Sequence, residues 1–327
     1  MRILKVLFLL LLLFVSCQQK EKPHAYTFYY WKTRLALNTE EKKSLDKATS
    51  PFLYTRFFDV NKVNGKFQPV AVITKDKNFK PDKTIVPTVF ITNQSFLNIT
   101  EQEIKFLAES IYSLIQKKAS EYHLNINNEI QIDCDWTAGT RDDYFKFLKE
   151  LKTISDKEIT STLRLHQVKD KKIMGVPPVE KVYLMCYSTS SPLETSDKNS
   201  ILDIHILKAY LSQLEDYPIK NMEVALPIYS WGIITNHLGK HRLINALSVS
   251  DLNHPDFKKI SENKAEIMRD GFYFGNYLNK GFTIKVEEIS SAQLKEAVHF
   301  LDRKLSHFNI VYYQLDSRFV FNQNFSL

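Results

Sequence analysis

The chain has 327 residues, of which 44% are hydrophobic, 13% aromatic and 25% charged, and its formal net charge is +7. This composition is typical of a folded globular protein and excludes an intrinsically disordered chain. The basic runs are short and are not interleaved with aromatic residues, so no nucleic-acid partner is expected. A chain of this length holds either two ordinary domains or a single barrel.

The first residues predict export. Basic residues precede an apolar run over residues 6–15, which is too short to favour a membrane-spanning helix and has the form of a secretory signal peptide. The run ends in Phe14-Val15-Ser16-Cys17, which resembles a bacterial lipobox with Cys17 as the acylated residue. We therefore expect a lipoprotein signal peptide over residues 1–16 and a lipidated tether over residues 17–25. A plain secretory peptide with an incidental cysteine is the alternative.

A lipid on Cys17 would anchor the protein to a membrane of the bacterial cell envelope. The outer membrane is the expected one, on its periplasmic or its exposed side. The polar tether, together with Leu165-His166-Gln167 and Gly175-Val176-Pro177-Pro178, resembles Bacteroidota lipoproteins.

The remaining chain alternates strand-like and helix-like segments. The predicted strands are residues 26–31, 52–60, 88–93, 130–137, 160–168, 182–187, 223–231 and 309–316, and the predicted helices are residues 39–48, 100–122, 141–151, 201–214 and 292–305. Eight strands with helices between most of them predict an α/β fold, a (β/α)8 TIM-like barrel over residues 26–327. Residues 232–290 break the rhythm and are expected to form a small β-containing insertion after the seventh strand. A doubly wound sheet is the alternative, but its strands would be apolar on both faces.

The fourth predicted strand carries two acids on one side. Asp133 and Asp135 alternate with apolar residues, so both should face the barrel interior. Like charges at this spacing should raise the pKa of at least one carboxyl group where water is scarce, which would make a proton donor. Alternatively, the two carboxylates simply pair with nearby arginines or accept backbone N–H bonds.

Four motifs in strand order resemble family 18 glycoside hydrolases, the chitinase-like barrels. The family's D-x-x-D-x-D-x-E corresponds to residues 130–137, where the two inner acids match but Ile130 replaces the first Asp and Thr137 replaces the catalytic Glu. The other three are Met185-Cys186-Tyr187-Ser188, Leu226-Pro227-Ile228-Tyr229-Ser230 and Tyr313-Gln314-Leu315-Asp316. The resemblance implies a glycan partner. Because Thr137 cannot supply a proton near neutral pH, the family's usual chitinase mechanism is not expected, since loss of general acid catalysis costs about 10²–10⁴ in rate.

Inward polar residues and strand-end aromatic residues make up the expected site. The expected catalytic residues are Asp133, Asp135 and His166, with Asp135 as the acid and Asp133 raising its pKa. The expected substrate-binding residues are Arg56, Arg164, Tyr187, Glu223, Tyr229, Trp231, Tyr313 and Asp316. In the alternative interpretation the aromatic residues are barrel core, His166 is an ordinary hydrogen-bonded residue, and Arg56 and Glu223 form a buried pair.

Neither a cofactor nor a metal is expected. The acids and His166 have admissible ligand types, but no further His or Glu lies at a supporting spacing. Cys134 and Cys186 lie on the apolar sides of different strands and are expected to be buried free thiols. Two functions remain open: a glycan-directed barrel that hydrolyses its ligand, and a non-catalytic sugar-binding or scaffold lipoprotein derived from a glycoside hydrolase.

Overall fold

The computed structural model describes residues 23–194, 196–320 and 325. The predicted signal peptide and Cys17 therefore lie outside the described residues, and the lipid anchor stays a prediction. No helix in the described part of the chain is both long enough and apolar enough to cross a membrane.

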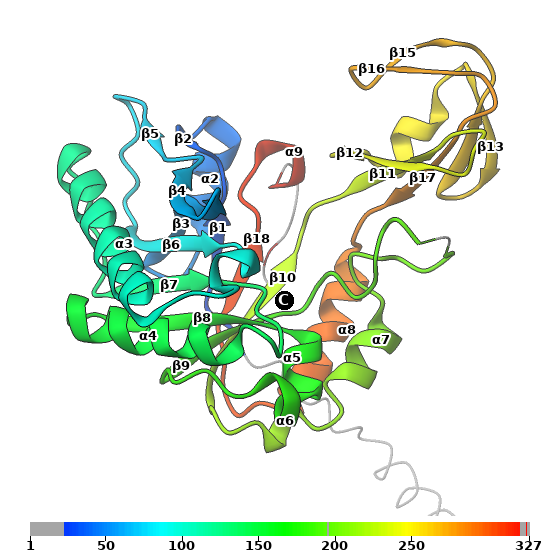
Figure 1. Ribbon diagram of the computed structural model, residues 1–327. Coiled ribbons are helices and arrows are strands. Elements are labelled where there is room, and N and C mark those ends of the chain that lie inside the picture. Colours follow the sequence, from blue (N-terminus) through cyan, green and yellow to red (C-terminus); the bar gives the residue numbers. More distant parts are fainter. Residues whose placement is uncertain (1–22, 195, 321–324, 326–327) are drawn as a thin grey trace, which may run out of the picture.

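Eight parallel strands close into a barrel, which confirms the predicted fold (Figure 1). They are β1 (Tyr26–Tyr30), β3 (Phe52–Val63), β6 (Thr84–Ile91), β7 (Glu129–Asp133), β8 (Glu158–Arg164), β9 (Lys181–Met185), β10 (Asn221–Pro227) and β18 (Ile310–Tyr313). Each strand pairs with the next in this order, β18 pairs with β1, and the β1–β3 pairing closes the barrel. A hairpin strand, β4 (Lys66–Val70), extends β3 outside the barrel.

Helices cover the outside of the barrel (Figure 1). They are α2 (Thr39–Lys47), α3 (Glu101–Glu121), α4 (Arg141–Ser155), α5 (Leu165–Lys169), α6 (Lys171–Met174), α7 (Ile204–Tyr210), α8 (Ser291–Asp302) and α9 (Ser317–Val320). The longest, α3, begins at the predicted capping box: Glu103 N donates to Thr100 Oγ1 at 3.2 Å, and Thr100 N donates to Glu103 Oε2 at 2.8 Å. These bonds satisfy N–H groups that a helix start otherwise leaves without partners.

The lower half of the barrel interior is filled. Tyr29, Tyr54 and Tyr183 pack there with small apolar residues of neighbouring strands. Beneath them the buried carboxylate of Glu129 accepts hydrogen bonds from Thr160 Oγ1 at 2.8 Å and from the Tyr183 hydroxyl at 2.7 Å. Because side chains close this end, open space inside the barrel is left mainly at the carboxyl ends of the strands.

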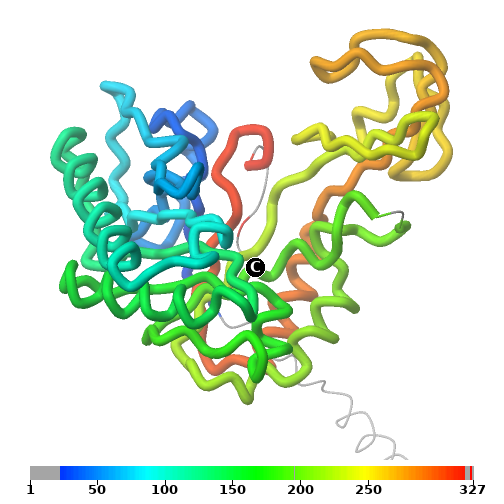
Figure 2. The backbone as a smooth tube through the Cα atoms, in the orientation of Figure 1, coloured from blue at the N-terminus to red at the C-terminus, as the bar shows by residue number. Residues whose placement is uncertain are grey.

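An antiparallel sheet follows β10 and stands away from the barrel (Figure 2). Its strands, in spatial order, are β12 (His241–Asn245), β11 (Trp231–Thr235), β17 (Thr283–Glu287), β14 (Lys264–Ile267) and β13 (Phe257–Ser261), and a hairpin of β15 (Gly271–Tyr273) and β16 (Asn276–Leu278) lies beside them. The sheet buries its own apolar cluster, which includes Ile234, Ile267 and Ile284. This sheet occupies the region where the sequence predicts the insertion.

Two predicted strands end early. The predicted strand 160–168 ends at Arg164 because Arg164 N donates to Gln167 Oε1 at 2.8 Å, which starts helix α5 at Leu165. The predicted strand 223–231 is divided, since β10 ends at Pro227 and Trp231 already belongs to β11. Both differences change which side chains reach the interior.

Candidate functional site

A cavity of about 530 Å³ opens at the carboxyl ends of the barrel strands. Most of the predicted site residues line it, namely Arg56, Asp133, Asp135, Arg164, Tyr187, Tyr229, Trp231 and Tyr313. This end of a (β/α)8 barrel is where such folds carry their sites, because the strand ends and the following loops meet there. The volume lies within the roughly 300–1,000 Å³ of small-molecule sites.

Asp133 is the last residue of β7 and faces the cavity. Its Oδ1 accepts a hydrogen bond from Thr162 Oγ1 on the neighbouring strand β8 at 2.7 Å. Burial raises the pKa of Asp133 to about 7, the adjacent charge of Asp135 raises it further, and Thr162 and Arg164 oppose the shift. The carboxyl group therefore holds a proton over part of the neutral pH range, as the spacing of the two acids predicts for one of them.

Asp135 lies beyond the end of β7 and is the more accessible acid. Its side chain is 43% exposed, and Oδ2 accepts a hydrogen bond from Arg164 Nη1 at 3.0 Å. Among the described residues this is the one contact of the Arg164 guanidinium, so its other N–H groups remain available. The raised pKa that was expected on Asp135 is found on Asp133 instead, because Asp133 is the acid removed from water.

A β-bulge in β3 forms a second charged pair. Arg56 pairs with Thr88 and Phe58 with Val89, so Phe57 is an extra residue in the strand. This shift lets Arg56 and Asp59, three residues apart, both line the cavity. Arg56 Nε donates to Asp59 Oδ1 at 2.6 Å, and Arg56 Nη2 donates to Asp59 Oδ2. The expected pair of Arg56 with Glu223 is therefore wrong.

Aromatic rings form a continuous wall of the cavity. Tyr187 stacks on Tyr313 with ring centroids 5.5 Å apart, and Tyr229 meets Tyr313 edge-on at 5.7 Å. Trp231 lies 5.2 Å from Tyr229, and Trp31 lies 5.7 Å from Tyr313. We name these five residues the aromatic wall. They pack against one another like core residues and also face the cavity, so both interpretations of these residues hold in part.

Three predicted site residues lie elsewhere. His166 belongs to α5 and does not line the cavity, because β8 ends before it. Burial and Arg164 lower its pKa. Glu223 lies at the opposite end of the barrel, where it accepts hydrogen bonds from the backbone N–H and side chain of Asn309. Asp316 is buried behind the cavity and accepts from Arg318 Nη2 at 2.8 Å, while Arg318 itself lines the cavity.

Thr137, which stands at the position of the family's catalytic Glu, is exposed and does not line the cavity. Its Oγ1 lies 3.3 Å from Thr140 Oγ1 at the start of α4. The side chain therefore contacts its own turn rather than the interior of the barrel.

The cavity also contains residues that the sequence did not single out. Trp31 directly follows the first strand, a position that could have suggested it. Asp59 and Asn245 carried no such signal, because one depends on the bulge and the other comes from the insertion. No group of three or more His, Cys, Asp or Glu in the described ranges could hold a metal ion. Cys134 and Cys186 are buried free thiols, as predicted.

No protein-family model and no curated protein sequence matches the chain. Among solved structures it is similar to the Bacillus cereus spore cortex-lytic enzyme SleL, with 15% identity, 91% of this chain and 72% of that chain covered, and a TM-score of 0.56. It is similar to catalytic domain 2 of the Ostrinia furnacalis group II chitinase, with 8% identity, coverage of 90% and 91%, and a TM-score of 0.54.

A third similar structure is the family 18 N-acetylglucosaminidase from Paenibacillus barengoltzii, with 11% identity, coverage of 91% and 98%, and a TM-score of 0.50. At these identities the likeness establishes the shared fold. The solved structures that this barrel resembles are thus glycoside hydrolases of the chitinase-like kind.

Proposed function

We propose that this barrel binds a glycan in the cavity around Asp133 and Asp135. The observation that carries the proposal is the aromatic wall facing the acids and Arg164 across one open cavity. Pyranose rings have an apolar face that packs on aromatic rings, and their hydroxyl groups pair with carboxylates and guanidinium groups. The similarity to glycoside hydrolase structures supports the same class of ligand.

The site offers two ways to use a bound glycan. In the first, the barrel hydrolyses the glycan, with Asp135 reaching the glycosidic oxygen and Asp133 holding the proton that the acid pair shares. The pKa of Asp133, raised to about 7, favours this function because a general acid must be protonated near the working pH. In the second, the barrel only binds the glycan. The exposed Thr137 at the position of the family acid favours that function.

We further propose that the protein is an envelope lipoprotein held to the membrane through Cys17. The support comes from the leader: an apolar run after basic residues, followed by a small residue and a cysteine. In this arrangement the tether of residues 17–25 leads into β1 and leaves the barrel outside the lipid. The glycan would then belong to the cell envelope or to the cell's surroundings.

The test is a glycan screen that scores binding and cleavage for the wild type, Asp135→Asn and Thr137→Glu. Asp142→Asn serves as the control, because Asp142 is an exposed acid on α4 that pairs with Arg141. Cleavage that Asp135→Asn abolishes would identify a hydrolase. Binding without cleavage, with hydrolysis gained in Thr137→Glu, would identify a binding protein. If no glycan is bound or cleaved while all variants are folded, the proposal fails.

A further inference from the structure

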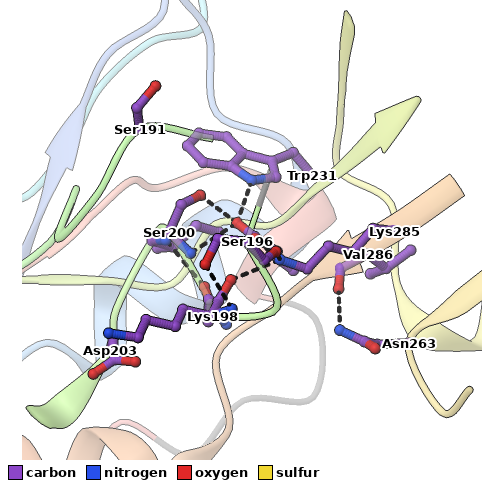
Figure 3. Close-up of polar contacts among 12 residues, drawn as sticks. Ser191, Ser196, Lys198, Ser200, Asp203, Trp231, Asn263, Lys285 and Val286 are labelled. Atoms are coloured by element: carbon purple, nitrogen blue, oxygen red, sulfur yellow. Dashed lines mark hydrogen bonds and ion pairs between the residues drawn. The ribbon is translucent and has the colours of Figure 1, made fainter. Parts of the chain in front are cut away.

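A buried carboxylate lies where the insertion meets the barrel. Glu287, at the end of β17, is 2% exposed and does not line the cavity. Its Oε2 accepts hydrogen bonds from Trp231 Nε1 at 2.9 Å, from Ser200 N at 3.0 Å and from Ser200 Oγ. Its Oε1 accepts from Lys285 Nζ at 2.8 Å. Trp231, Ser200 and Lys285, labelled in Figure 3, thus converge on one side chain.

Lys285 extends this cluster to the loop between β9 and α7. We name residues 186–194 and 196–203 the β9–α7 loop. Lys285 Nζ also donates to the carbonyl oxygens of Ser196 at 2.7 Å and Lys198 at 2.6 Å (Figure 3). The lysine side chain is 16% exposed, so its charge depends on these acceptors and on Glu287. Together the two side chains tie the loop to the insertion.

Both segments that meet at Glu287 also line the cavity. The β9–α7 loop contributes Tyr187 and Ser188 to the cavity, and β11 contributes Trp231. Residues Trp231 and Glu287 are opposite one another in the β11–β17 pair, which sets the indole N–H against the carboxylate. A change in the loop at Ser200 can therefore reach Trp231 through a single carboxylate.

We propose that Glu287 is a positioning residue for ligand binding, which couples the orientation of the Trp231 indole to the position of the β9–α7 loop. The ligand's identity as a glycan rests on the proposed function, whereas the coupling between the two segments does not. Removing the carboxylate leaves several buried donors without their acceptor, which is costly in a protein interior. Trp231 and the loop should then lose their common orientation together.

The first experiment compares Glu287→Gln with Glu288→Gln. The neighbouring Glu288 is exposed and its side chain accepts from Val249 N at 3.1 Å, so this control removes a charge without touching Trp231. The proteins are labelled with 5-fluorotryptophan, which reports Trp31, Trp136 and Trp231 separately, and Trp231→Phe assigns the third resonance. Buried Trp136, which donates to Met174 O at 2.9 Å, is the internal reference.

We expect Glu287→Gln to shift or broaden the Trp231 resonance, to leave the Trp136 resonance in place, and to speed hydrogen exchange in the β9–α7 loop several-fold. Glu288→Gln should do neither. Ser200→Ala alters only the loop side of the cluster, so a shifted Trp231 resonance in this variant would show the coupling directly. It also carries the test if Glu287→Gln does not fold. Unchanged Trp231 resonances and loop exchange in the folded variants would overturn the proposal.

Ligand binding is measured separately with the glycan that the screen identifies. We expect Glu287→Gln to weaken binding about tenfold, the effect of losing a hydrogen bond to a charged group. Failure of the screen combined with a shifted Trp231 resonance would reject the glycan and keep the coupling. Wild-type affinity in Glu287→Gln, with an unshifted Trp231 resonance, would reject the positioning role and keep the glycan.

Discussion

Asp133 and Asp135 lie two residues apart on the same side of the chain, yet they have different partners. Asp133 accepts a hydrogen bond from the neutral Thr162 hydroxyl at 2.7 Å, whereas Asp135 accepts one from the Arg164 guanidinium at 3.0 Å. The first carboxyl group is removed from water and the second is 43% exposed. The pair thus separates a group that holds a proton from a group that can reach a ligand.

The raised pKa of Asp133 predicts that the protein becomes less stable as pH rises. Its pKa is about 7 in the folded protein and about 3.9 in the unfolded chain, so the folded state binds more protons between these values. The free energy of unfolding should fall as pH rises from 4 and level off above 7, by on the order of 4 kcal/mol at most.

Asp133→Asn should flatten this dependence, and Asp142→Asn should keep it. Urea unfolding at several pH values between 5 and 8 measures the difference. Equal slopes in the wild type and Asp133→Asn would contradict the prediction.

Arg164 lowers the pKa of Asp133, so Arg164→Gln should raise that pKa above its wild-type value. The measurement is a pH titration of the Asp133 carboxyl carbon by NMR. The control is Arg141→Gln, since Arg141 pairs with the exposed Asp142 outside the cavity. A lower pKa in Arg164→Gln would mean that the arginine does not act on Asp133 through its charge.

The pair of Arg56 and Asp59 should contribute to stability, because both side chains are largely buried at 16% and 13% exposure. Asp59→Asn leaves the guanidinium without its charged partner, and we expect a loss of roughly 2–4 kcal/mol in the free energy of unfolding. Asp142→Asn, on an exposed pair, should cost less than about 0.5 kcal/mol. Similar losses in both variants, measured by urea unfolding, would argue against a special role for the bulge pair.

Cys17→Ala should turn a membrane-bound protein into a soluble or unprocessed one, because the lipid is attached through that thiol. Fractionation of cells that express each protein measures this. Cys186→Ala is the matched control, since it removes a buried thiol far from the leader and should leave the protein in the membrane fraction. An unchanged distribution in Cys17→Ala would show that the leader is not a lipobox.

The sequence by itself determined the barrel and the direction of its central acids. Strand periodicity is local, so the alternation around Asp133 and Asp135 sufficed to place both on the inner side of one strand. The order of strands and helices, with few other ways to close eight parallel strands, was enough to predict the fold. The aromatic residues at strand ends could be assigned to the cavity for the same reason.

Only the tertiary structure decided which other groups meet the acids. The bulge at Phe57 brings Asp59 beside Arg56, and a one-residue change of register reverses the side that a side chain faces. The early end of β8 removes His166 from the cavity, and the closed barrel places Glu223 at its other end. The pKa of Asp133 depends on Thr162 and Arg164, which come from the neighbouring strand. Such contacts join residues far apart in the chain, and local periodicity carries no information about them.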